Sequence, residues 1–275
     1  MSGVHLIENA HIGQIPETPL TPNFDRASIK DACELIVKFG LHYGIPTGYK
    51  QEQNGQLVHS IAPNPATETA QISSSSKVTL ELHTETAFHP YKPSHLILMC
   101  LRGDKNALTT FCDVDHIIEE LDDETVGHLT RNAYMTSVDD SFRSNGEADQ
   151  KIRMPILSEQ KDGSFNICYD RALMVGLDED ASKALDKLNK AIPKRTSSIA
   201  LKSGDVLIID NKKTIHGRLP FTPRYDGTDR WLLRLLVIDR LPPMTEQYIL
   251  GHMVITTDFS KPVFGGEHPY NFGRK

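Results

Sequence analysis

The segment 230–238, with the sequence RWLLRLLVI, constrains the fold more than any other part of the chain. Its period of two and its apolar character predict a strand that is buried on both faces. Arg230 and Arg234 fall on the same face of this strand, where each needs an anion or a water-filled cavity to offset its desolvation. The two arginines therefore indicate either a structural ion pair or, for Arg230, a bidentate clamp on the carboxylate of a bound ligand.

A second strand is predicted just before His83, because apolar and polar residues alternate from Val78 onward. His83 and Glu85 are two residues apart and therefore point the same way. With a third His from a distant strand, such a pair makes the two-His-one-carboxylate triad that leaves three sites free on Fe(II). Among twelve histidines, only His83 has an acidic residue two positions on. A buried His satisfied by its neighbours is the alternative interpretation.

A histidine in the second half of the chain can complete this triad. A Ser-Gly-Asp turn at 203–205 leads into the apolar strand 206–209, and a second short strand ends at His216. Gly217 follows directly, and a glycine allows another backbone to approach closely. His216 is therefore the candidate third ligand.

These residues together resemble a known family. The pattern His83-Thr84-Glu85, then His216, then Arg230 fourteen positions later and Arg234 four further on, is similar to that of the clavaminate synthase-like Fe(II)/2-oxoglutarate-dependent oxygenases. The sequence of residues 217–232 resembles that of the free L-arginine, L-asparagine and L-lysine hydroxylases of that group. The resemblance runs from about residue 48 to 238. It implies a distorted double-stranded β-helix, a cupin-like jelly roll with flanking helices, whereas periodicity alone predicts only a β-rich α+β chain.

The resemblance also implies the ligands of a catalytic centre. His83, Glu85 and His216 would bind Fe(II), while Arg230 and a threonine would hold the C5 carboxylate of the cosubstrate 2-oxoglutarate. Thr109 and Thr110 lie at the matching distance from His83, and only one of two neighbouring strand residues can face inward. We favour Thr110. O2 would then be consumed in a reaction that releases succinate and CO2 and hydroxylates an unactivated carbon.

Substrate contacts are expected from six residues by the same resemblance: Gln53, Ser73, Ser74, Glu85, Asp170 and Arg234. Arg234 would meet the α-carboxylate of an amino acid, and Glu85 its amine. A solvated hairpin at Gln53 and a flexible serine linker at 73–76 are the alternatives. Arginine hydroxylases carry an acid where this chain has Cys168, so a paired-carboxylate grip on a guanidinium is in doubt.

A lid is expected over residues 137–150, which are polar and contain Asp140, Ser141 and Phe142; a surface loop is the alternative. The chain is predicted to form one domain, 1–275. Residues 1–47 would supply an arm and a helix, 48–240 the jelly-roll core, and 241–275 a tail. Further helices are expected at 113–134 and 177–194.

Charge and cysteine usage limit the partners. A net charge of −6 argues against nucleic acid and anionic membranes. No signal or membrane-length apolar segment is present, and the four cysteines show no paired motif, so a cytoplasmic enzyme is predicted. A homo-oligomer is left open.

The predicted function is hydroxylation of C3 or C4 of a free L-amino acid with a polar or cationic side chain. One alternative is an oxygenase of another small acid, such as a sulfonate, or of a carrier-bound or peptide-bound amino acid. A non-catalytic or zinc-loaded jelly-roll binding protein is the alternative from a different class.

Overall fold

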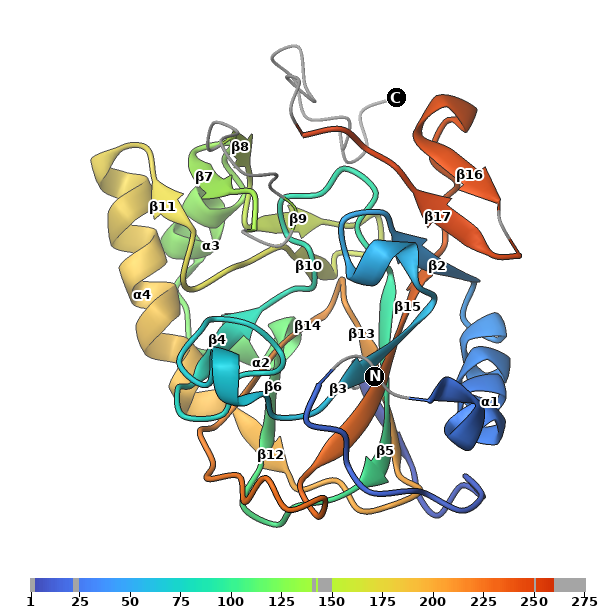
Figure 1. Ribbon diagram of the computed structural model, residues 1–275. Coiled ribbons are helices and arrows are strands. Elements are labelled where there is room, and N and C mark those ends of the chain that lie inside the picture. Colours follow the sequence, from blue (N-terminus) through green and yellow to red (C-terminus); the bar gives the residue numbers. More distant parts are fainter. Residues whose placement is uncertain (1–2, 22–24, 140–141, 143–149, 250, 260–275) are drawn as a thin grey trace.

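The computed structural model describes residues 3–21, 25–139, 142, 150–249 and 251–259, and two β-sheets form its centre (Figure 1). The larger sheet has the following strands in spatial order: β1 (Val4–Ile7), β13 (Val206–Asp210), β5 (His95–Arg102), β15 (Trp231–Ile238), β2 (Ile45–Tyr49), β17 (Met253–Ile255) and β16 (Gln247–Ile249). β3 (Val58–Ile61) also pairs with β15. All pairings in this sheet are antiparallel except that of β17 with β2.

The smaller sheet contains four antiparallel strands, in the order β12 (Ser197–Ile199), β6 (Thr109–Asp113), β14 (Thr214–Arg218) and β4 (Leu80–His83). The remaining strands form a three-stranded and a two-stranded sheet: β11 (Val175–Gly176) with β7 (Tyr134–Ser137) and β8 (Lys151–Met154), and β10 (Phe165–Ile167) with β9 (Leu157–Glu159). The protein is thus a β-rich α+β structure.

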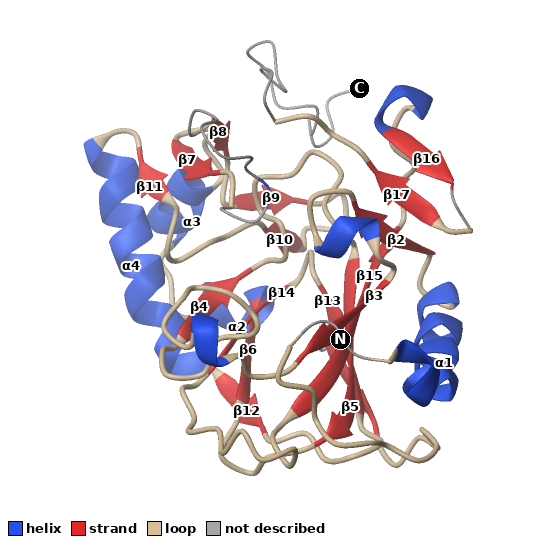
Figure 2. Cartoon of the chain, viewed as in Figure 1, coloured by secondary structure: helices blue, strands red, loops and turns tan. Residues whose placement is uncertain are grey.

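Helices cover the two outer sides of this β structure (Figure 2). α1 (Lys30–Leu41) packs on the larger sheet. α2 (Val114–Ile118), α3 (Asp123–Leu129) and α4 (Glu179–Arg195) lie beside the smaller one. α4 begins where the Asp178 side chain accepts a hydrogen bond from the Ala181 amide, and its apolar stripe is buried. The helix predicted within 1–47 and the helices predicted at 113–134 and 177–194 are confirmed. No helix in the described residues is long and apolar enough to cross a membrane.

β15 is the centre of the larger sheet, and all of its residues are buried. Trp231 and Leu233 are on the face that packs with α1 residues such as Ile36. The other face carries Leu232 and Arg234 and looks toward the smaller sheet. The alternation predicted for 230–238 is therefore confirmed, and it separates an apolar helix-covered face from a face that carries charge.

Both chain ends differ from the expected division of the domain. β1 lies within the predicted arm 1–47 and extends the larger sheet by pairing with β13. β16 and β17 lie within the predicted tail 241–275 and join the same sheet through β2. These strands have only three or four residues. A segment this short shows little periodicity of its own, and it becomes a strand because it pairs with a strand already in place.

Candidate active site

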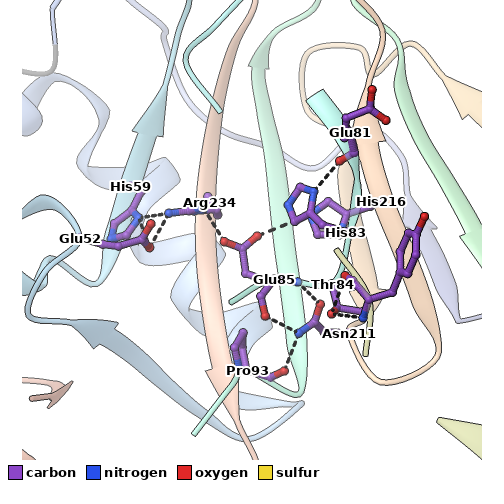
Figure 3. Close-up of polar contacts among 11 residues, drawn as sticks. Glu52, His59, Glu81, His83, Thr84, Glu85, Pro93, Asn211, His216 and Arg234 are labelled. Carbon is purple, nitrogen blue, oxygen red and sulfur yellow. Dashed lines mark hydrogen bonds and ion pairs between the residues drawn. The ribbon is translucent and has the colours of Figure 1, made fainter. Parts of the chain in front are cut away.

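Two strands of the smaller sheet and the turn after β4 bring together three side chains that could bind a metal ion (Figure 3). His83 ends β4 and is paired directly with His216 of β14, with ring centroids 4.5 Å apart. Glu85 follows two residues after His83. Candidate ligand atoms of the three residues all lie within 4.8 Å of one another. The structure thus assembles the triad that the sequence suggested from separate segments.

The pairing of these strands depends on Gly217. A Cβ atom there would lie 2.5 Å from the Leu80 carbonyl oxygen and 3.2 Å from Thr110 Oγ1. The ladder between β14 and β4 is irregular between His216 and Arg218, so the backbones meet closely at the glycine. The close approach expected at Gly217 is confirmed.

Asn211 holds the backbone of Glu85 in place (Figure 3). Its Oδ1 accepts a hydrogen bond of 2.7 Å from the Glu85 amide, and its Nδ2 donates to the carbonyl oxygens of Glu85 and Pro93 at 3.1 and 2.9 Å. The amide of Thr84 donates to the carbonyl of Tyr169 at 2.8 Å. Glu85 lies beyond the end of β4, so these contacts replace the strand ladder in fixing its direction.

The three donors fit a divalent transition metal such as Fe(II). His83 Nδ1 lies 2.7 Å from the Glu81 carbonyl oxygen, which can only accept, so Nδ1 carries the proton and Nε2 offers its lone pair. Burial and neighbouring His83 lower the pKa of His216, which favours the neutral ring that ligation requires. Burial opposes ionisation of Glu85, but Arg234 and His216 hold the pKa of its carboxyl below the usual range. The Nε2 atom of His83, the His216 ring and the Glu85 carboxylate are therefore available as ligands.

A pocket with a volume of about 40 Å³ opens beside this cluster, between the two sheets. Its walls come from both sheets and from one loop: Ile61, Ser73, Leu80, His83, Glu85, Leu96, Leu98, Thr109, His216, Gly217, Arg218, Arg230, Leu232 and Arg234. The candidate metal ligands and the buried arginines therefore line one pocket.

Arg230 is buried and has no ion-pair partner within the described parts of the chain. Its Nη2 donates to Thr109 Oγ1 at 3.1 Å. Burial lowers the pKa of Arg230 to about 10, which still leaves it cationic at neutral pH. A buried cation without a counter-ion is costly, so this end of the cavity favours an anionic ligand.

Thr109 lines the cavity, and the prediction of Thr110 for this position was wrong by one residue. Thr109 lies opposite Arg218 in the β6–β14 pairing, on the face that looks into the cavity. Thr110 lies opposite Gly217 and points to the other face, because neighbouring residues of a strand alternate.

Arg234 connects Glu85 to Glu52 and to His59 of β3 through three hydrogen bonds of 2.7 Å (Figure 3). Nη1 donates to Glu85 Oε1, whereas Nη2 donates to Glu52 Oε2 and to His59 Nδ1. Burial opposes the charge on Arg234, but Glu52 and Glu85 more than offset it, so its pKa is raised. Burial raises the pKa of Glu52, partly offset by Arg234.

Glu52, not the predicted Gln53, therefore reaches this part of the site. Gln53 Nε2 donates over 3.5 Å to the Ser60 carbonyl oxygen, within its own hairpin. Gln53 and Asn54 both have positive φ, at 43° and 56°. The backbone turns sharply directly after Glu52, and this turn directs Glu52 toward Arg234 and Gln53 away from it.

The other predicted substrate residues separate into two groups. Ser73 lines the cavity, but Ser74 Oγ bonds to Thr67 Oγ1 at 3.1 Å within its own loop. The Asp170 backbone bridges to His83. Its Oδ1 accepts from the amides of Ala172 and Leu173 at 2.8 and 3.0 Å, as in a turn. Asp170 thus lies beside His83, and neither Asp170 nor Ser74 lines the cavity.

The predicted lid is seen only in part. Asp140 and Ser141 lie outside the described residues. Phe142 is buried, and its ring packs edge to face with Tyr49 and Phe88 at centroid distances of 5.7 and 5.0 Å. Its packing is that of a core residue.

Four residues of the site were not expected from the sequence: Glu52, His59, Asn211 and Arg218. Arg218 donates to the Ser75 hydroxyl and to the carbonyls of Ser76 and Val78, and so fastens the loop before β4. Glu52 could have been identified from its position just before the Asn-Gly turn at 54–55. Asn211 could not have been identified, because its local sequence is that of an ordinary turn and its partners Pro93 and Glu85 are 118 and 126 residues away.

Comparison with known proteins agrees with this geometry. The family model described as "Taurine catabolism dioxygenase TauD, TfdA family" matches residues 19–236. The chain is 35% identical over 216 residues to enduracididine beta-hydroxylase of Streptomyces hygroscopicus, covering 70% of this chain and 62% of the relative. It is 34% identical over 194 residues to L-lysine 3-hydroxylase of Catenulispora acidiphila, covering 69% of this chain and 54% of that relative.

A solved structure is also similar. Asparagine oxygenase in complex with Fe(II), 2S,3S-3-hydroxyasparagine and succinate superposes with a TM-score of 0.82 at 30% identity, covering 93% of this chain and 80% of that one.

The fold and the site define a β-rich protein with a two-His-one-carboxylate cluster inside a cavity. The chain belongs to the TauD/TfdA dioxygenase family, because the family model matches well over half of its length. The chain spans about three fifths of the length of the enduracididine hydroxylase and just over half of the length of the L-lysine 3-hydroxylase.

Proposed function

We propose that this protein is an Fe(II)- and 2-oxoglutarate-dependent dioxygenase that hydroxylates C3 or C4 of a free L-amino acid. The observation that carries the proposal is that the cavity beside His83, Glu85 and His216 also contains Arg230, a buried cation without an ion-pair partner in the described residues. Bound Fe(II) supplies the activation of O2 that couples conversion of 2-oxoglutarate to succinate and CO2 with hydroxylation. The two sheets around the cavity support a distorted jelly roll as the fold.

Arg230 and Thr109 would bind the C5 carboxylate of 2-oxoglutarate. Arg230 supplies charge and parallel N–H donors, and the Thr109 hydroxyl lies 3.1 Å from its Nη2. The apolar side chains of Leu98 and Leu232 line the same cavity and exclude water from the aliphatic part of the cosubstrate.

Replacement of Thr109 by valine is expected to raise the KM for 2-oxoglutarate about tenfold. The hydroxyl is lost without a change of shape, and a hydrogen bond to a charged group contributes about 1.5–3 kcal/mol. The matched control is Thr110→Val, which alters the neighbouring residue of β6 on the opposite face. Steady-state kinetics of succinate formation provide the measurement. A larger effect from Thr110→Val would return the role to Thr110.

The group around Arg234 would recognise the substrate as an α-amino acid. Arg234 Nε is buried and has no hydrogen-bond partner among the described residues, so it can donate to the α-carboxylate. Glu52 and Glu85 lie on the two sides of the guanidinium and can accept from the α-ammonium group. Ser73 provides a hydroxyl on the cavity wall. A zwitterion is thus matched by one cation and two carboxylates, and positioning is the main contribution of these residues.

The substrate side chain is proposed to be polar or cationic. Asp170 does not line the cavity, but it lies next to His83 through its backbone bridge. Its Oδ1 accepts from two amides, which leaves Oδ2 for a polar or cationic group of the substrate. The relatives named above include a lysine hydroxylase and an asparagine oxygenase. A cytoplasmic location and one domain, 1–275, stay predictions.

The proposal is tested by succinate formation from anaerobically Fe(II)-loaded protein given 2-oxoglutarate and O2, screened across the twenty L-amino acids. One or a few amino acids are expected to stimulate succinate formation and to give a product heavier by one oxygen atom in the mass spectrum. Stimulation by none of them would overturn the proposal and would direct the search to carrier-bound amino acids and other small acids.

A further inference from the structure

A histidine that no catalytic step uses is held against Arg234. His59 of β3 is the residue directly opposite Arg234 of β15 in the strand pairing, and it is 2% exposed. Its Nδ1 lies 2.7 Å from Arg234 Nη2, and its Nε2 lies 2.9 Å from the Gln56 carbonyl oxygen. Both ring nitrogens therefore have a partner within the protein.

The partners determine the protonation of His59. The Gln56 oxygen can only accept, so Nε2 carries the proton, and Arg234 can only donate, so Nδ1 is bare. Burial and the charge of Arg234 lower the pKa of His59 to about 3, in agreement with this neutral form. His59 is therefore a fixed neutral acceptor, because Glu52 and Glu85 already supply the negative charges around Arg234.

This third contact determines the orientation of the guanidinium. Glu85 holds Nη1, while Glu52 and His59 together use Nη2. With its two terminal nitrogens fixed at three points, the planar group cannot rotate, and the remaining buried donor Nε keeps one direction. Without His59, each terminal nitrogen would keep one carboxylate contact, to Glu85 or to Glu52, and the guanidinium could tilt about the line that joins these two contacts.

We propose that His59 is a positioning residue that orients Arg234 for the α-carboxylate of the amino acid. The carbon to be hydroxylated then lies at the correct place beside His83, Glu85 and His216. This inference rests on the function proposed above. Among the described residues, the polar partners of the His59 ring are Gln56, Arg234 and Glu52 and include none of the three candidate metal ligands, so its influence on the site passes through the guanidinium.

Two amide variants separate the two nitrogens of His59. His59→Asn places an acceptor oxygen where Nδ1 lies and loses the donor to Gln56. His59→Gln places its amide where Nε2 lies and loses the acceptor for Arg234. We expect His59→Gln to raise the KM for the amino acid about tenfold, as loss of one hydrogen bond to a charged group does. It should also lower the amount of hydroxylated product per succinate, whereas His59→Asn should remain within about twofold of wild type in both.

The controls exclude a merely structural effect. The KM for 2-oxoglutarate and the Fe(II) content should be unchanged in both variants, since Arg230 and the triad are not altered. A wild-type amino acid KM in His59→Gln would overturn the proposal, as would equal losses in both variants that follow their thermal stability. If His59→Gln does not fold, His59→Ala with and without added neutral imidazole gives the same comparison, and absence of rescue would then count against the proposal. Failure of the wild-type protein with every amino acid would instead overturn the proposed function.

Discussion

Replacement of His216 by alanine is expected to abolish both Fe(II) binding and amino-acid-stimulated succinate formation. His216 is buried opposite His83, and its Nε2 lies 3.5 Å from Glu85 Oε2, so the three ligands depend on one another. Removal of one member of such a set is expected to lower turnover roughly 10⁴-fold. Iron retained after anaerobic loading and gel filtration, together with the initial rate of succinate formation, provides the measurement.

The control for this variant is His116→Ala, which removes an exposed histidine of α2. It should keep full iron content and full activity. Thermal unfolding should show that the His216 variant is still folded. A folded His216→Ala protein that binds stoichiometric iron and turns over normally would contradict the assignment of the triad.

The parts of the fold that the sequence predicts well are those with a long, regular pattern. β15 and its two faces follow from the alternation in 230–238, and α4 follows from its apolar stripe and its acidic first turn. The triad follows because both ligand segments are local: His83 and Glu85 are two residues apart, and His216 precedes a glycine. In each case the pattern itself contains the physical constraint.

At Gln53 and Thr110 the neighbouring residue, Glu52 or Thr109, takes the predicted place, and each difference has a geometric cause. The face of a strand changes with every residue, so the choice between Thr109 and Thr110 depends on the β6–β14 register, which neighbouring residues do not encode. The choice between Glu52 and Gln53 depends on where a left-handed turn begins.

The supporting residues could not be predicted, because their partners are distant in the sequence. Asn211 contacts Glu85 across 126 residues, and His59 contacts Arg234 across 175. Both look like ordinary turn or strand residues until the sheets assemble. The sequence of a site thus contains its chemistry, whereas the contacts that orient the chemistry arise only from the tertiary fold.

Replacement of Arg230 by methionine is expected to raise the KM for 2-oxoglutarate roughly 10²-fold, because loss of one partner of a buried charge pair contributes about 2–5 kcal/mol. Arg230→Lys should recover part of this affinity, since lysine keeps the charge but cannot form two parallel hydrogen bonds. The KM for the amino acid should change much less, because Arg234, Glu52 and Glu85 form a separate group.

The matched control is Arg224→Met, a half-exposed arginine in the loop before β15 whose side chain bonds to the Thr228 carbonyl. It should leave both KM values unchanged. Steady-state kinetics with each substrate varied in turn provide the comparison, and thermal unfolding checks the fold.

Because Arg230 lacks an ion-pair partner in the described residues, its loss removes a desolvated charge as well as a ligand contact. Arg230→Met should therefore be at least as stable as wild type without ligand, while binding the cosubstrate more weakly. A variant with unchanged 2-oxoglutarate KM would show that the cosubstrate is bound elsewhere in the cavity.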